Sequence, residues 1–195
     1  MPEFGLVLLA AGRGSRFGEA PKLLQPWKGK PLVRHAAEAA LGARLGPVVA
    51  VLGAHADAVG TALKDLDLVR VTNPSYAMGL STSLLAGLAA LPDRVPGVLV
   101  LLGDMPRVTP GHLTGLADAF RLVDPAPSAV VPVHGGQRGN PVLLNRALLA
   151  QSLAGLSGDQ GAGRLLAGRG DVLEIPMDAG VTLDVDTPAG LFALG

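Results

Sequence analysis

The stretch from Gly5 to Gly18 reads GLVLLAAGRGSRFG and changes abruptly from an apolar run to glycines and arginines. Its apolar half, Phe4 to Leu9, is nearly continuous, as expected for a strand of a parallel sheet that helices cover on both faces. The half rich in glycine and arginine then follows the carboxyl end of that strand, where open α/β sheets bind their ligands. The stretch therefore predicts both the fold class and the place of the site.

The rest of the chain repeats this alternation of short apolar runs and helical segments. The other expected strands are Pro47 to Leu52, Leu68 to Val71, Val98 to Leu102 and Ser128 to Val133. The expected helices are Pro31 to Ala43, Asp57 to Leu66, Ser81 to Leu91 and Pro110 to Leu122. This order predicts one α/β domain over residues 1–195, Rossmann-like, with a mainly parallel sheet flanked by helices.

Composition excludes several classes of protein. The 16 Lys and Arg residues balance 16 Asp and Glu residues, so no net field attracts nucleic acid or an anionic membrane. The chain has no cysteine, which excludes disulfides, thiolate nucleophiles and cysteine metal sites. Apolar runs are far shorter than the roughly 20 residues of a membrane span, and Met1 to Phe4 lacks the basic region of a signal peptide. We expect a soluble, cytoplasmic protein with small-molecule substrates.

The first loop, Gly12 to Gly18, carries two arginines and is followed by Lys22. Its third glycine comes one residue too late for a dinucleotide fingerprint, and no Gly-Lys-Ser/Thr closes a Walker A loop. Glycines let backbone amides approach an anion closely, while Arg13, Arg16 and Lys22 supply positive charge. The residues predict a phosphate-binding loop. The alternative is an ordinary strand-to-helix turn with solvated arginines.

A carboxylate ends the strand Val98 to Leu102: Asp104 follows it, after Gly103. A hard cation that bridges phosphates needs such a group at this edge of the sheet. The alternative is a turn or helix cap, but Thr109 before Pro110 already offers a cap for the next helix. The pattern favours the metal ligand.

A second acidic segment lies near the end of the chain. Asp184 and Asp186 alternate in what reads as an extended segment, which places them on one face, and Pro188 suits the first turn of a helix. From the residues alone, Asp186 serves equally well as a cap for that helix or as a second metal ligand.

The run Leu9-Ala-Ala-Gly-x-Gly-x-Arg16, followed by Pro21-Lys22-Leu-Leu24, resembles the signature of nucleotidyltransferases. These enzymes join a nucleoside monophosphate to a phosphorylated acceptor, and among them the chain is most similar to the molybdenum cofactor cytidylyltransferases. Further segments resemble that family in the same order; they begin at Gly79 (Gly-x-Ser-x-Ser), Gly103 (Gly-Asp-Met-Pro), Gly136 (Gly-x-Arg-Gly-Asn-Pro-Val), Gly158 (Gly-Asp-x-Gly-Ala) and Asp184 (Asp-x-Asp-Thr-Pro). One departure is Gly163, which stands where the family has arginine; Arg164 follows it.

The resemblance implies roles for named residues. Catalytic roles fall to Lys22, Asp104 and Arg16, and Mg²⁺ ligands are Asp104 and Asp186, with Asp184 in support. The nucleotide-binding residues are Leu9, Ala10, Ala11, Gly12, Gly14, Arg16, Lys22, Asn73, Gly79, Ser81 and Gly103. The acceptor-binding residues are Arg138, Asn140 and Asp159. Taken alone, the residues also allow Ser81 to be a helix N-cap and Arg138 to be a solvated arginine of a loop.

The implied activity is transfer of CMP from CTP to the phosphate of molybdopterin, with release of pyrophosphate and dependence on Mg²⁺. Alternatives are transfer of GMP from GTP to the same acceptor, and cytidylyl transfer to a sugar or polyol phosphate. A nucleotide-binding module without catalysis, or a hydrolase that uses Ser81, would belong to other classes. A phosphate nucleophile, with a second pKa of about 6, requires no general base, which suits a chain whose histidines suggest no catalytic dyad. A molybdoenzyme or a chaperone stays open as a protein partner.

Overall fold

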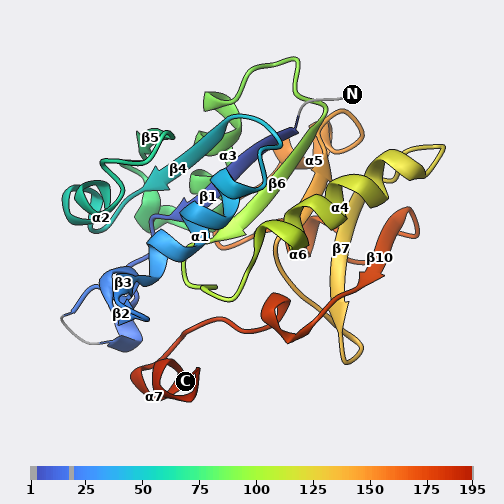
Figure 1. Cartoon of the computed structure of the whole chain (residues 1–195). Helices are drawn as coiled ribbons and strands as arrows, with labels where there is room; N and C mark the ends of the chain where they lie inside the picture. Colours follow the sequence, from blue (N-terminus) through green and yellow to red (C-terminus); the bar gives the residue numbers. More distant parts are fainter. Residues whose placement is uncertain (1–3, 18–19, 195) are drawn as a thin grey trace.

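The computed structural model describes residues 4–17 and 20–194 and places β1 (Phe4–Ala10) in the middle of a mixed, mostly parallel sheet (Figure 1). The strand order is β10-β7-β9-β6-β1-β4-β5, with β8 paired to β7. The other strands are β4 (Val48–Leu52), β5 (Val69–Thr72), β6 (Gly97–Leu102), β7 (Ala129–His134), β8 (Gln137–Arg138), β9 (Val142–Asn145) and β10 (Val172–Pro176). A small hairpin of β2 (Pro26–Trp27) and β3 (Lys30–Pro31) lies outside this sheet.

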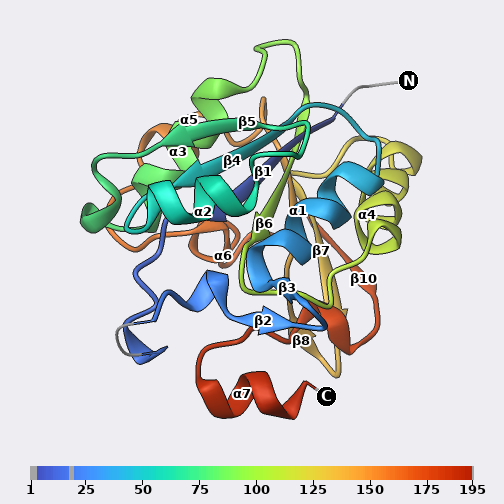
Figure 2. The same cartoon turned by 60° about the vertical axis from the view of Figure 1, so that its left-hand side comes forward.

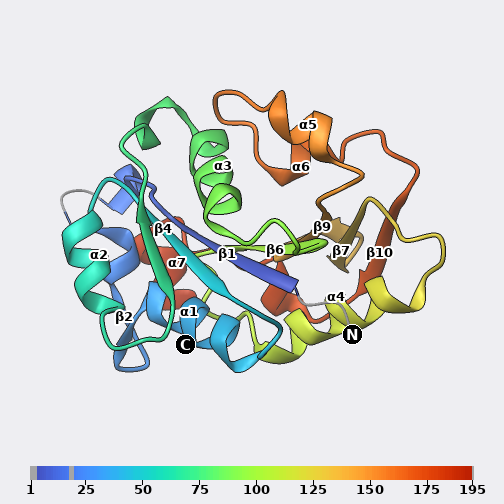
Figure 3. The same cartoon turned by 90° about the horizontal axis from the view of Figure 1, so that it is seen from above.

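Helices cover both faces of the sheet, as Figure 3 shows from above: α1, α2 and α4 on one face, and α3, α5 and α6 on the other. The helices are α1 (Leu32–Gly42), α2 (Ala56–Ala62), α3 (Leu80–Ala90), α4 (Pro110–Leu122), α5 (Ala150–Ala154), α6 (Ala162–Leu165) and α7 (Pro188–Ala193). The 3₁₀ turns are η1 (Ser15–Phe17), η2 (Lys22–Leu24), η3 (Tyr76–Met78) and η4 (Ala179–Val181). The layers form a single α/β domain, as predicted.

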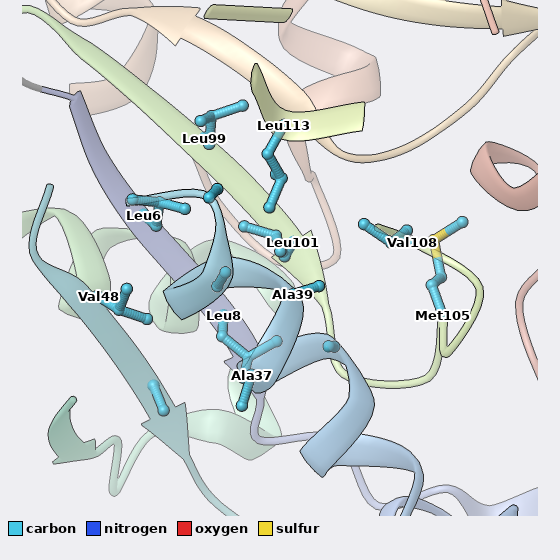
Figure 4. Packing of buried hydrophobic residues seen from close by; sticks show 14 of the residues in the cluster. Leu6, Leu8, Ala37, Ala39, Val48, Leu99, Leu101, Met105, Val108 and Leu113 are labelled. Atoms are coloured by element: carbon cyan, nitrogen blue, oxygen red, sulfur yellow. The ribbon is translucent and has the colours of Figure 1, made fainter. Parts of the chain in front are cut away.

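All seven residues of β1 are buried, and successive side chains enter different cores. Leu6 and Leu8 pack with α1 and α4, next to Leu99 and Leu101 of β6 (Figure 4). Val7 and Leu9 join the opposite core beneath α3. Because side chains alternate across a strand, a strand buried on both faces must be apolar throughout.

The five predicted strands and four predicted helices are present, with shifted ends. The second predicted helix stops at Ala62 rather than Leu66. Thr109 caps α4 as predicted, since its side-chain oxygen accepts the His112 backbone N–H. Sequence reasoning missed β9, which pairs antiparallel with both β6 and β7, because its four residues follow an irregular loop that gives no strand signal.

The chain leaves the sheet after β10 and runs through η4 to α7, which lies below the β2–β3 hairpin in Figure 2. The predicted start of a helix at Pro188 is confirmed, and Thr187, not Asp186, caps it. Within the residues described, no helix is long and apolar enough to cross a membrane.

Candidate active site

The first loop follows β1 and forms the floor of a cavity of about 410 Å³. Gly14 has a φ of +61°, and a Cβ on it would lie 2.6 Å from Cβ of Lys22. Only glycine therefore allows the loop to close against the base of Lys22. Gly18, the last glycine of the loop as read from the sequence, lies outside the described residues. The cavity walls are Leu9, Ala11, Gly12, Arg13, Gly14, Lys22, Leu23, Tyr76, Ala77, Gly79, Leu80, Ser83, Leu102, Gly103, Asp104 and Asp159.

Four charged side chains meet beside this cavity. The Lys22 ammonium donates to Oδ2 of Asp104 at 2.5 Å and to Oδ1 of Asp186 at 3.2 Å. The Arg16 guanidinium donates to the other oxygen of Asp186. Three segments far apart in sequence therefore converge here, with Lys22 and Asp104 largely buried and Asp186 half-buried.

Burial lowers the pKa of Lys22, but the two carboxylates outweigh this effect, and the pKa stands above its ordinary value. Asp104 and its hydrogen bond raise the pKa more than Asp186 does. Lys22 therefore carries a full positive charge at neutral pH.

Asp104 also offers an oxygen that no described group satisfies. Its Oδ1 is buried and has no hydrogen-bond partner among the described residues. Buried polar atoms are rarely left unpaired, and an unpaired one calls for an explanation such as an ion. One or two carboxylates, completed by phosphate oxygens, form the usual site for Mg²⁺. The oxygens of Asp104 and Asp186 fit that donor set.

Most of the predicted nucleotide-binding residues line the cavity, but Ala10, Arg16, Asn73 and Ser81 do not. Arg16 lies beside it, in the ion pair with Asp186. Ala10 points from the end of β1 into the core beneath α1. Ser81 is buried, and its backbone N–H donates to the Gly158 carbonyl at 3.1 Å. It lies inside α3, whose N-cap position is Gly79, so the alternative of Ser81 as N-cap is wrong.

Asn73 is the last of these four, and its side-chain amide supports the cavity wall from behind. Its Oδ1 accepts the Ser75 backbone N–H at 2.9 Å, and its Nδ2 donates to the hydroxyls of Thr82 at 2.8 Å and Ser83 at 3.0 Å. These bonds join the η3 turn to the first turn of α3. The buried amide thus holds in place the segment that carries Tyr76 and Gly79.

Sequence reasoning overlooked Tyr76, Ala77, Leu80 and Ser83 as cavity residues. The Arg13 guanidinium lies over the Tyr76 ring, 5.6 Å from its centroid, so the first loop and the η3 turn meet across the cavity. Tyr76 is the single tyrosine of the chain and lies two residues after Asn73-Pro74, within the motif region, a signal that sequence reasoning did not use.

Only one of the three predicted acceptor residues lines the cavity. Asp159 lines the cavity with Lys22. Arg138 lies outside its walls and pairs with Glu174 at 2.6 Å. The Asn140 backbone N–H donates to the Val181 carbonyl at 2.8 Å, next to η4.

Replacing Gly79 by alanine is expected to damage this site. Gly79 has a φ of +117°, and a Cβ there would lie 2.2 Å from the Gly158 carbonyl carbon. The strained backbone alone costs about 1–3 kcal/mol, and the clash pushes the Gly158 loop away from α3. We expect Gly79→Ala to lower the melting temperature and weaken nucleotide binding. Gly163→Ala is the matched control, because its Cβ meets no atom within 4 Å; equal melting temperatures would contradict the prediction.

Comparison with known proteins places this architecture in a family. Residues 6–173 match the model of the MobA-like NTP transferase domain. The chain is 35% identical to the nicotine blue oxidoreductase of Paenarthrobacter nicotinovorans over 194 residues, covering 96% of this chain and 94% of that protein. It is 41% identical to the bifunctional protein GlmU of Halorhodospira halophila over 114 residues, which are 57% of this chain but 23% of GlmU.

Among solved structures, the crystal structure of Rv0371c from Mycobacterium tuberculosis superposes with a TM-score of 0.85 at 31% identity, covering 99% of this chain and 97% of that one. Rv0371c has also been solved as a complex with manganese, which matches with a TM-score of 0.80 at 32% identity and covers 98% of this chain and 97% of that one. The sequence match and the shared fold together show that this chain belongs to the MobA-like NTP transferase family of nucleotidyltransferases.

Proposed function

We propose that this protein transfers CMP from CTP to the phosphate of molybdopterin, releases pyrophosphate and depends on Mg²⁺. The observation that carries the proposal is the convergence of Lys22, Asp104 and Asp186 beside the cavity over the first loop. The family supports nucleotidyl transfer, and the manganese complex of Rv0371c supports a divalent cation.

The charged residues have different roles in an in-line displacement at the α-phosphorus. The cations of Lys22 and Arg16 leave their carboxylate partners and face the triphosphate, where they stabilise negative charge on the leaving group. Asp104 and Asp186 would hold Mg²⁺, which supplies neutralisation of phosphate charge. An oxygen of the acceptor phosphate bonds to the α-phosphorus while the bond to the β-phosphate oxygen breaks, and pyrophosphate leaves with the electron pair. The acceptor oxygen is already ionised, so no general base is needed.

The choice of substrates comes from the motifs. The segment Gly79 to Ser83 and the Arg-Gly-Asn-Pro-Val run at Arg138 favour the cytidylyl, molybdopterin type. Within this proposal Arg138, Asn140 and Asp159 contact the acceptor, although only Asp159 lines the cavity. A cytoplasmic location, and delivery of the product to a molybdoenzyme or a chaperone, belong to the same proposal.

A pyrophosphate-release assay tests the proposal. Purified protein is mixed with Mg²⁺, one of the four nucleoside triphosphates, and molybdopterin, and then with a sugar or polyol phosphate instead. We expect release with CTP and molybdopterin. Release with GTP alone would reverse the base assignment, release only with a sugar or polyol phosphate would change the acceptor, and no release under any condition would overturn the proposal.

A second candidate is a redox enzyme, favoured by the full-length similarity to a protein named nicotine blue oxidoreductase. The chain has no cysteine, so the electrons would have to come from a bound cofactor such as a reduced nicotinamide. Loss of nicotinamide absorbance in the presence of a quinonoid dye, without release of pyrophosphate from any triphosphate, would favour this candidate.

A further inference from the structure

Residues 182–194, here called the strap, carry Asp186 to the site and end in α7. The match to the family model ends at residue 173, before the strap begins. We propose that α7 is a clamp that sets the position of Asp186 relative to Asp104, with Val185, Leu194 and Arg107 as positioning residues. The proposal rests on the proposed function in one respect, that these two carboxylates hold the divalent cation.

The main chain links the two carboxylates directly. The Val185 backbone N–H donates to the carbonyl of Asp104 at 3.0 Å. Asp186 is the next residue, so any movement of the strap at Val185 changes the separation of the two carboxyl groups. With the strap in this place, the ammonium of Lys22 lies 3.2 Å from Oδ1 of Asp186.

An apolar cluster holds the strap against the body of the protein. Val185 is fully buried, and it packs with Leu32 of α1 and with Leu194 at the end of α7. Trp27 of the hairpin packs against the same cluster. Burying several large aliphatic side chains stabilises more than one hydrogen bond does after its exchange with water. The cluster, rather than the Val185 hydrogen bond, therefore keeps the strap docked.

The far end of the strap is tied to the loop that carries Asp104. The Arg107 guanidinium donates to the Leu194 carbonyl. At the near end, the Thr187 hydroxyl accepts the Gly190 backbone N–H at 3.1 Å and caps α7. With six residues, α7 is too short to be stable by itself. Its order depends on these contacts, and the position of Asp186 depends on its order.

The strap contributes no residue to the walls of the 410 Å³ cavity over the first loop, as far as the described residues show. Loosening α7 should therefore leave the nucleotide pocket intact while the cation site opens. A change that only weakened the fold would affect both. This difference separates a positioning role from a general structural role.

The experiment compares a substitution at the end of α7 with a matched control inside α7, and adds two variants outside the helix. Leu194→Ala removes a side chain from the cluster, whereas Phe192→Ala removes a side chain that is 87% exposed. Arg107→Gln removes the tie from an exposed residue, and Val185→Ala shortens the buried side chain next to Asp186. For each variant we measure Mn²⁺ binding by electron paramagnetic resonance, CTP binding without metal, amide hydrogen exchange of residues 182–187, and kcat.

We expect Leu194→Ala, Arg107→Gln and Val185→Ala to weaken Mn²⁺ binding and to lower kcat, each by about tenfold, the scale of coupling between contacting residues. Faster exchange of the strap amides should accompany the loss, CTP binding should stay unchanged, and Phe192→Ala should resemble the wild type. Mn²⁺ binding that is equal in Leu194→Ala and Phe192→Ala, or absent from the wild type, would overturn the clamp. The wild type could bind Mn²⁺ but transfer no nucleotide, while Leu194→Ala loses the Mn²⁺ binding. That combination would support the clamp and reject only the proposed function.

Discussion

Asp104→Asn should reduce nucleotidyl transfer by about three orders of magnitude, the largest effect that we expect from a single substitution. Asparagine keeps the size of the side chain but loses the negative charge and one of its two oxygens. Its single oxygen cannot both accept from Lys22, as Oδ2 does at 2.5 Å, and serve as the buried Oδ1, which has no donor among the described residues. A cation on phosphate oxygens is worth several kcal/mol of transition-state stabilisation, and about 1.4 kcal/mol corresponds to a factor of ten. The loss should appear in kcat, measured by pyrophosphate release at saturating Mg²⁺.

The control for this variant is Asp118→Asn. Asp118 also accepts from a cation, Arg121 at 2.8 Å, but on the exposed face of α4. Exposed pairs contribute little, so Asp118→Asn should keep both its melting temperature and its kcat. If Asp104→Asn retained more than about a tenth of the wild-type kcat, Asp104 could not hold the cation.

Lys22→Met should have the second largest effect, a loss of about 100-fold or more in kcat, because one preorganised donor to a developing negative charge is removed. Its effect on the cation should have the opposite sign. In the wild type the ammonium occupies Oδ2 of Asp104 and Oδ1 of Asp186. Without the ammonium, less positive charge balances the two carboxylates. Mn²⁺ should therefore bind more tightly than to the wild type, as measured by electron paramagnetic resonance.

Lys30→Met serves as the control, since Lys30 forms a comparable pair with Glu38 at 2.6 Å away from the site. It should change neither Mn²⁺ binding nor kcat. Weaker Mn²⁺ binding in Lys22→Met would show that the lysine and the cation do not compete for the same oxygens. Unchanged kcat would remove Lys22 from the phosphate chain.

The fold was predictable where burial on both faces leaves a plain pattern. The runs Phe4 to Leu9 and Val98 to Leu102 proved to be the two central strands, β1 and β6, because each must be apolar along its whole length to face helices on both sides. The irregular part of the chain was not predictable in the same way. β9 is fully buried but only four residues long, and β10 is partly exposed and interrupted by Glu174, so neither carries a long continuous apolar run.

The site was predictable to the extent that its residues follow strands or stand in a motif. Gly12, Lys22 and Asp104 follow the ends of β1 and β6, which pair side by side, so the loops after them had to meet. Asn73 shows the limit of a motif, because its side-chain amide already forms hydrogen bonds with Ser75, Thr82 and Ser83. A motif marks a position as needed without saying whether the side chain meets the ligand or holds the wall.

The sequence by itself determined the order of strands and helices along the chain, because each element has its own local pattern of apolar residues. It also determined that a basic loop and an acidic loop lie at one edge of the sheet. Only the tertiary structure decided that Asp186 meets Lys22 across 164 residues and that Arg138 pairs with Glu174. The contact between Lys22 and Asp186 depends on where the strap docks after β10. A small apolar cluster that joins the strap to the segment around Leu32, far away in the sequence, decides that docking, and no local pattern of residues encodes such a contact.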